Sequence, residues 1–180
     1  TKVAKTRKAS AGNTTGAPQH GRNVGGLLRY LYGPGKKDEH EDPHLVASWD
    51  GQEQDHEPQR YTRPDGTEYP SIARLAGELT DPIESALGIS LDDPHVYHLV
   101  LSNKADADRD LTDAEWGQAA ADMLDAVGVA PKGDPDGCRW VAVRHGKSAS
   151  GNDHVHVVAT LARQDGRAVN PWNDYAKLRE

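Results

Sequence analysis

Three histidines in the last quarter of the sequence have the residue type and spacing of a metal site. His154 and His156 are separated by one residue, so on a β-strand both side chains leave the same face, with Cα atoms about 6.5–7 Å apart. His145 ends the preceding apolar run, and a short turn between antiparallel strands would bring its imidazole beside the other two. Three neutral imidazoles leave coordination positions of an ion open, as a catalytic site requires. We therefore expect His145, His154 and His156 to bind one divalent metal ion.

The alternative for these residues is a pair of half-exposed strand histidines without a ligand. One His-x-His match is expected by chance about half the time in a chain with 9 histidines among 180 residues, so the third histidine carries the prediction. All-imidazole ligation suits Zn²⁺, Mn²⁺ or another transition ion better than Mg²⁺, although phosphate oxygens and water could complete a shell that admits Mg²⁺. A chain of this length forms a core without a metal, so we assign the ion to chemistry rather than to folding.

The hydrophobic pattern indicates the elements that must hold these histidines. Two runs, residues 138–145 and 153–162, are rich in β-formers and are joined by a polar turn, which predicts an antiparallel hairpin. Residues 96–102 form a third predicted strand. Thr112 and Glu115 match a capping box at the start of a long predicted helix.

Helices are also predicted before the first of these strands. An apolar stripe over residues 24–31 predicts a short amphipathic helix, with Asn23 as a possible N-cap. Residues 71–87 predict two short helices or one kinked helix, because Pro82 interrupts the pattern, and residues 45–49 could be a strand or an ordered loop. This order of elements indicates an α+β fold, in which an antiparallel sheet with a central histidine-bearing hairpin is flanked by helices.

The charges are unevenly distributed along the chain. The formal net charge is −7, but residues 1–37 hold eight basic side chains and no acidic one, residues 38–136 sum to −18, and residues 137–180 sum to +3. Because a phosphate backbone is bound by a local positive surface, the acidic middle does not exclude DNA. We expect residues 1–22 to be a basic, flexible segment and residues 23–180 to be a single domain, which could be a fragment of a longer protein.

The composition favours a protein of the cytoplasm. Hydrophobic residues make up 36% and charged residues 27% of the sequence, as in ordinary globular proteins. The lone Cys138 cannot form an intramolecular disulfide, and the sequence contains neither an apolar run of membrane-spanning length nor a leader-like start.

The sequence resembles the HUH-type relaxases of conjugative and mobilisable plasmids in three motifs that occur in the family's order. Residues 26–31, GLLRYL, resemble the first motif, in which a tyrosine on a leucine-rich helix is the nucleophile. Residues 97–102, YHLVLS, resemble the second motif, whose serine helps to hold the DNA near the nick. Residues 140–145 and 152–158 resemble the third motif, which supplies the metal-binding histidines.

This resemblance implies an HUH endonuclease-like two-layer sandwich. It also implies a metal-dependent enzyme that nicks and rejoins one DNA strand through a covalent 5′-phosphotyrosine. The reaction would initiate plasmid or conjugative-element transfer. It implies Tyr30 as the nucleophile and Ser102 as a DNA contact. From the basic N-terminal block we add Arg29, Lys36 and Lys37 to the expected DNA-binding residues. The expected cofactor is a divalent ion, Mn²⁺ or Mg²⁺ in use. The expected partner is single-stranded DNA at an origin of transfer, to which accessory relaxosome and coupling proteins could be added.

Tyr32 and His20 are the alternative nucleophiles. Tyr30 and Tyr32 lie roughly 200° apart around a helix axis, so one helix cannot present both to the same site. Both flank the apolar stripe, so periodicity does not separate them; the resemblance selects Tyr30, and we expect Tyr32 to pack on the helix flank. Some relaxases use a histidine nucleophile, which keeps His20 as a minor candidate. For His98 on the third predicted strand we favour a hydrogen-bonded core histidine over a metal ligand.

Two positions depart from the family's pattern. Relatives often carry an aspartate two places after the first metal histidine, where this chain has Lys147, and tend to carry an asparagine four places after the last, where it has Thr160. The groups that surround the metal ligands are therefore not carried over from the family.

Two other functions compete with a relaxase. A replication initiator or transposase-like nickase shares the metal and the tyrosine but usually places the tyrosine after the histidine pair, where Tyr175 is the candidate. A non-catalytic DNA-binding or metal-binding module would use the histidine cluster structurally. A covalent protein–DNA adduct discriminates the enzymes from the module.

Overall fold

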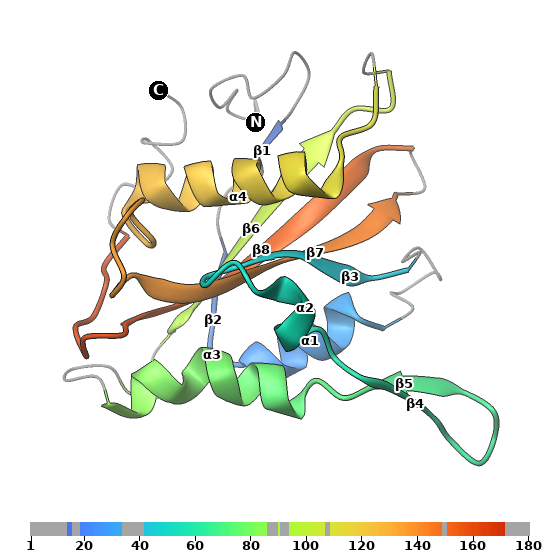
Figure 1. The fold of residues 1–180 in the computed structure, drawn as a ribbon, viewed down its shortest axis with the longest axis horizontal. Helices are drawn as coiled ribbons and strands as arrows, with labels where there is room; N and C mark the ends of the chain where they lie inside the picture. The colour runs from blue at the N-terminus through green and yellow to red at the C-terminus, as the bar shows by residue number, and fades with distance from the viewer. Residues whose placement is uncertain are drawn as a thin grey trace.

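The computed structural model describes residues 14–15, 19–33, 42–85, 90, 94–106, 109–148 and 151–171, and its central element is one antiparallel sheet (Figure 1). The strands follow the order β1-β6-β8-β7-β3, and β2 also pairs with β6. They comprise β1 Thr14–Thr15, β2 Gln19–Gly21, β3 His44–Ser48, β6 Val96–Asn103, β7 Cys138–Lys147 and β8 Asp153–Arg163. The histidine-bearing hairpin β7–β8 lies within this sheet, with β6 on one side and β3 on the other.

Helices cover both faces of the sheet (Figure 1). The helices are α1 Val24–Leu31, α2 Glu53–His56, α3 Ala73–Ser85 and α4 Asp113–Val127. The first apolar cluster joins Trp116 of α4 to strand residues such as Val157, and we call this side of the sheet the α4 face. The second joins Leu28 of α1 and Leu79 of α3 to strand residues such as Val158, on what we call the α1–α3 face. Among the described residues, no helix combines the length and the apolar character that crossing a membrane requires.

This architecture confirms the predicted α+β class, an antiparallel sheet flanked by helices with the histidine hairpin in its interior. Alternation along the strands explains why both faces are covered. Successive β8 residues Val157 and Val158 belong to the two different clusters, because neighbouring side chains on a strand point to opposite faces. Both faces of the central strands therefore carry apolar side chains, and helices cover these on both sides.

Side-chain caps fix the ends of the two helices that matter most for the site. The Asn23 side chain accepts a hydrogen bond from the Gly26 amide at 2.7 Å and starts α1. Thr112 and Glu115 form the predicted capping box of α4, in which each side chain bonds the other's backbone amide. Gly128 ends α4 with a φ of 76°, a left-handed conformation that favours glycine.

Helix α3 is one helix that contains Pro82, rather than two separate helices. A proline cannot donate to the carbonyl four residues earlier, which here belongs to Glu78. Arg139 of β7 supplies the missing donor, because its Nη1 lies 2.5 Å from the Glu78 carbonyl oxygen. A side chain from the sheet therefore donates the hydrogen bond that the Glu78 carbonyl cannot receive from Pro82.

Short strands occur where the sequence pattern was indistinct. The undecided stretch at residues 45–49 lies largely in β3, which pairs with β7 and has an irregular register between Leu45 and Ala47. β4 Arg60–Thr62 and β5 Glu68–Pro70 form a separate hairpin that projects from the body of the protein (Figure 1). Within the N-terminal segment predicted to be flexible, β1 and β2 pair with β6.

Candidate metal centre and nucleophile

The hairpin β7–β8 brings His145, His154 and His156 together on the α1–α3 face. One ring nitrogen from each histidine lies within 4.8 Å of those of the other two. The rings of His145 and His156 stack with centroids 4.4 Å apart, and the ring of His154 meets that of His145 edge-on at 4.9 Å. His145 is fully buried, whereas His154 and His156 are half-buried. The cluster is thus anchored in the protein at one side and accessible at the other.

The donor set fits a divalent transition ion. Metal–nitrogen bonds of about 2.0–2.1 Å hold two imidazole nitrogens roughly 3–4 Å apart, so small ring rotations suffice to bring these three nitrogens onto one ion. Three neutral ligands leave the positive charge of the ion undiminished, and three ligands leave positions for substrate and water. His145, His154 and His156 can therefore hold a metal ion.

A β-bulge directly follows His145. Arg144 pairs with Val155, but Lys147 pairs with Asp153, so β7 contains one residue more than β8 in this interval. Gly146 within the bulge has a φ of 74°, which a residue with a β-carbon rarely adopts. The bulge interrupts the regular pairing of β7 with β8 just beyond His145.

The two positions that depart from the family's pattern have other tasks in this chain. The Lys147 ammonium group pairs with the Asp110 carboxylate at 2.9 Å, and both side chains are exposed. The Thr160 hydroxyl is buried and donates to the Leu79 carbonyl of α3 at 2.8 Å. Neither side chain is directed to the metal ligands, and Thr160 instead ties β8 to α3.

A buried ion pair on the α4 face supports the same hairpin from behind. The carboxylate of Asp153 is almost fully buried and accepts hydrogen bonds from the Arg144 guanidinium, the shorter at 2.7 Å, and from the Trp116 indole at 3.2 Å. Arg144 also pairs with Asp113 at the start of α4. Asp153 and Arg144 are the sequence neighbours of His154 and His145, so the pair joins the two ligand-bearing strands. Sequence reasoning missed it, because within the two stretches that resemble the third motif only the histidines were singled out.

His98 of β6 contacts the cluster without being one of its three members. Its Nε2 lies 2.7 Å from Nδ1 of His156, and the two rings lie edge to edge with centroids 5.0 Å apart and an angle of 17° between their planes. Burial lowers the pKa of His98, which favours the neutral ring. The sequence predicted a hydrogen-bonded core histidine, and the structure adds that its hydrogen-bonding partner is a candidate metal ligand.

Tyr30 and Tyr32 lie at the end of α1 in very different surroundings. Tyr30 is 40% exposed, and Tyr32 is 4% exposed. The Tyr32 hydroxyl donates to Oε2 of Glu57 at 3.4 Å. Burial, together with the negative charge of Glu57, raises the pKa of Tyr32 far above its ordinary value. Tyr32 is therefore a packing residue, as expected, and Tyr30 is the exposed tyrosine of α1, the helix that packs on the α1–α3 face.

The other predicted site residues divide between the two faces and the undescribed parts of the chain. Ser102 pairs with His154 in the sheet register and lies on the α1–α3 face, and Arg29 is exposed on α1.

His20 pairs with Tyr97 and packs edge-on against its ring at 5.5 Å, which places it on the α4 face, away from the cluster. Lys36, Lys37 and Tyr175 lie outside the described residues.

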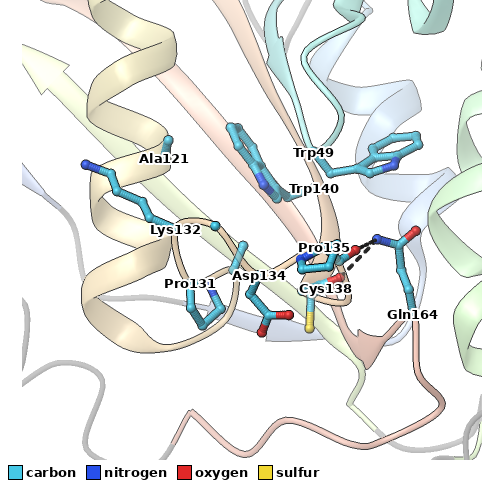
Figure 2. A pocket seen from close by; sticks show the side chains of 12 residues that line it. Trp49, Ala121, Pro131, Lys132, Asp134, Pro135, Cys138, Trp140 and Gln164 are labelled. Carbon is cyan, nitrogen blue, oxygen red and sulfur yellow. Dashed lines mark hydrogen bonds between the residues drawn. The ribbon is translucent and has the colours of Figure 1, made fainter.

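A pocket of about 410 Å³ opens on the α4 face, at the opposite end of β7 (Figure 2). Trp49 and Trp140 line it together with Cys138, whose pKa burial raises to about 12. Gln164 closes one side and donates to the carbonyl of Pro135 at 3.0 Å. The sheet separates this pocket from the histidine cluster, and its cysteine is an inert thiol at neutral pH.

Comparison with known proteins yields one family. Residues 83–180 match the model of the family described as "Relaxase: MobA/VirD2-like, nuclease domain". The match includes β6, α4 and the hairpin with all three clustered histidines, and it begins after α1. No curated protein and no solved structure matches the chain.

Proposed function

Because the chain belongs to the relaxase family with a MobA/VirD2-like nuclease domain, and is thus a DNA-nicking protein of mobilisation, we propose that it cuts and rejoins one strand through a covalent 5′-phosphotyrosine at Tyr30. The substrate in this proposal is single-stranded DNA at an origin of transfer. The reaction takes place in the cytoplasm, with accessory relaxosome and coupling proteins as further partners.

One observation carries the proposal. His145, His154 and His156 gather on the same sheet face that α1 covers, and α1 presents an exposed tyrosine. Phosphotyrosine chemistry needs two components, a bound cation and an accessible phenol. The histidine cluster could hold the cation, and α1 on the same side of the sheet supplies the phenol. The pocket on the α4 face offers neither, so the α1–α3 face is the proposed DNA-cleaving surface.

The strand transfer balances without water. The Tyr30 phenol loses its proton, its oxygen forms a bond to the scissile phosphorus, and the bond from phosphorus to the 3′ oxygen breaks. The 3′ oxygen takes up a proton and becomes a free hydroxyl. Because phenolate is a competent leaving group, the 3′ hydroxyl can attack the phosphotyrosine and reseal the strand.

His145, His154 and His156 would hold a divalent ion, Mn²⁺, Mg²⁺ or another transition ion. When bound, the ion would supply positive charge near the phosphate oxygens, which assists attack by a phenol, a weak nucleophile at neutral pH. Ser102, on the same face and opposite His154 in the register, is proposed to position the DNA. Arg29, Lys36 and Lys37 are proposed to contact its phosphates.

A covalent-capture experiment with random DNA tests this function and finds the recognised sequence at the same time. Single-stranded oligonucleotides with random interiors and a 3′ fluorophore are incubated with the protein and Mn²⁺ or Mg²⁺, then separated by denaturing electrophoresis. A 5′-phosphotyrosine retains the 3′ part of the DNA, so the fluorescence should migrate with the protein. Sequencing of the captured DNA then identifies the nick site.

Tyr30→Phe is the matched control, because it removes only the hydroxyl. Loss of the adduct in Tyr30→Phe supports the proposal. An adduct of equal yield in Tyr30→Phe would exclude Tyr30 as the nucleophile. Absence of an adduct with the unaltered protein and every ion would favour the non-catalytic DNA-binding or metal-binding module.

A further inference from the structure

The contact between His98 and His156 restricts where each ring carries its proton. A hydrogen bond between two imidazole nitrogens needs one N–H and one lone pair, and Nε2 of His98 lies 2.7 Å from Nδ1 of His156. If His98 donates, His156 accepts at Nδ1 and keeps its proton on Nε2, so that neither nitrogen of His156 has a lone pair for a metal. If His156 donates from Nδ1, its Nε2 has a lone pair available. The second arrangement alone leaves His156 able to bind an ion.

We propose that His98 is a positioning residue that accepts a hydrogen bond from Nδ1 of His156 and thereby directs Nε2 of His156 to the metal. This inference rests on the proposed metal site. The proton of the neutral His98 ring is then on its Nδ1. A ligand histidine generally donates its second N–H to a carboxylate or a backbone carbonyl, which fixes the tautomer and the ring orientation. In this chain an uncharged imidazole has that task.

The sheet holds the two rings in this relation. β6 and β8 pair without interruption from Val96 opposite Thr160 to Asn103 opposite Asp153. Val100 is the direct partner of His156, and His98 stands two residues away, so the two histidines are diagonal neighbours on one face. β7, in contrast, has a bulge beside His145. His98 therefore contacts the cluster from β6, whose pairing with β8 is regular, and not from the bulged strand β7.

An uncharged acceptor has a consequence for the charge of the site. A carboxylate at this position would cancel part of the charge of the ion and would increase the basicity of the ligand ring. An imidazole fixes the tautomer but adds no negative charge. The proposed site therefore keeps the full charge of the ion for the phosphate oxygens.

Metal affinity tests the inference independently of nicking. The metal-free protein and its variants are titrated with Zn²⁺ by calorimetry. His98→Leu removes the acceptor and should weaken the affinity about 10- to 100-fold, the usual effect of losing such a support. His98→Gln offers an amide oxygen at similar reach and should retain most of the affinity. His20→Leu makes the same chemical change on the α4 face and should bind as the unaltered protein does.

The tautomers provide a second measurement that a purely structural role would not change. Long-range ¹H–¹⁵N correlation spectra of the zinc-loaded protein should show His156 protonated at Nδ1 and His98 carrying one proton, also at Nδ1. A His156 ring protonated at Nε2 would overturn the inference. So would an affinity of His98→Leu equal to that of the unaltered protein, or a loss in His98→Gln as large as in His98→Leu. Should His98→Leu not fold, His98→Met makes the same test.

The failure of the metal site itself has a different signature. If the unaltered protein binds no divalent ion, the proposed metal site is wrong and this inference falls with it. If the unaltered protein binds the ion and the His98 variants bind it equally well, only the role of His98 is wrong.

Discussion

Tyr30 and Tyr32 are two positions apart, yet the first side chain is 40% exposed and the second is 4% exposed and bonded to Glu57. This difference separates two residues that periodicity left equivalent. It also makes them a matched pair for mutagenesis, because the same change from tyrosine to phenylalanine has a different meaning at each position.

Tyr30→Phe should abolish the covalent adduct and leave metal and DNA binding intact. Tyr32→Phe should keep the adduct and lower the free energy of unfolding by about 1 kcal/mol, since it removes one hydrogen bond from a partly buried carboxylate. Electrophoresis and urea unfolding measure the two effects. The reverse pattern, with the adduct lost only in Tyr32→Phe, would show that the nucleophile is assigned wrongly.

Replacing one clustered histidine should remove the metal without unfolding the protein. His154→Ala or His156→Ala should reduce metal-dependent nicking about a thousandfold, the order of effect expected when an ion no longer stabilises a phosphoryl transition state. The circular dichroism spectrum should be unchanged, because the core of the sheet does not depend on the ion. Full nicking by either variant after chelation would remove the ion from the mechanism.

His56 should make stability depend on pH. Its two ring nitrogens bond Asp50 at 2.9 Å and Glu78 at 2.8 Å. Burial alone would lower the pKa of His56, but the two carboxylates outweigh burial and raise the pKa above its ordinary value. The stabilisation is therefore complete below the unfolded-state pKa of about 6.5 and is lost as the pH rises through the higher folded-state pKa.

Urea unfolding at increasing pH from about 6 upward, on the unaltered protein and on His56→Gln, checks this dependence. The unaltered protein should lose stability over the interval, and the variant should lose less. Equal slopes would assign the pH dependence to other groups.

Arg139 and Pro82 should be energetically coupled. Arg139→Met leaves the Glu78 carbonyl without its side-chain donor and should cost about 1–3 kcal/mol. In a Pro82→Ala background the helix regains a backbone donor for that carbonyl, so the same change should cost about 1 kcal/mol less. A double-mutant cycle by urea unfolding measures the difference. Additive effects would show that the Arg139 hydrogen bond does not replace the one that Pro82 removes from α3.

DNA binding should depend strongly on salt although the net charge is −7. If Arg29 contacts a phosphate, Arg29→Ala should reduce the log–log salt slope by about 0.7 on a single strand. Arg109, held in an ion pair with Glu115, is the control, and Arg109→Ala should leave the slope unchanged. A slope near zero for the unaltered protein would mean that the basic N-terminal block does not bind phosphates.

The sequence predicted those elements whose pattern is long and uniform. β6, β7, β8 and α4 have enough β-formers or helical repeats to be recognised, and their order indicated the sheet. β3 was undecided because it is five residues long and its register is irregular between Leu45 and Ala47, which disturbs alternation. α3 continues through Pro82 because Arg139, distant in sequence, supplies a donor. The sequence around Pro82 does not indicate that a residue more than fifty positions away donates this hydrogen bond.

Within the site, spacing predicted which histidines meet but not what surrounds them. The register that sets His98 diagonal to His156 depends on how β6 pairs with β8, and no motif encodes it. The pair of Arg144 and Asp153 was missed because the sequence does not reveal that their side chains meet on the face opposite the histidines. His20 was kept as a candidate because the sequence does not reveal that β2 joins the edge of the sheet with this side chain on the α4 face.

The place of β8 between β6 and β7 has a kinetic consequence for the histidine pair it carries. A strand hydrogen-bonded on both sides cannot fray, so its amide hydrogens should exchange with solvent only when the whole domain opens, whereas β1 and β2 at the edge exchange through local fluctuations. We therefore expect the amides of His154 and His156 to be among the slowly exchanging amides of the described sheet. An ion held there would be retained through partial openings that are confined to the edge of the sheet.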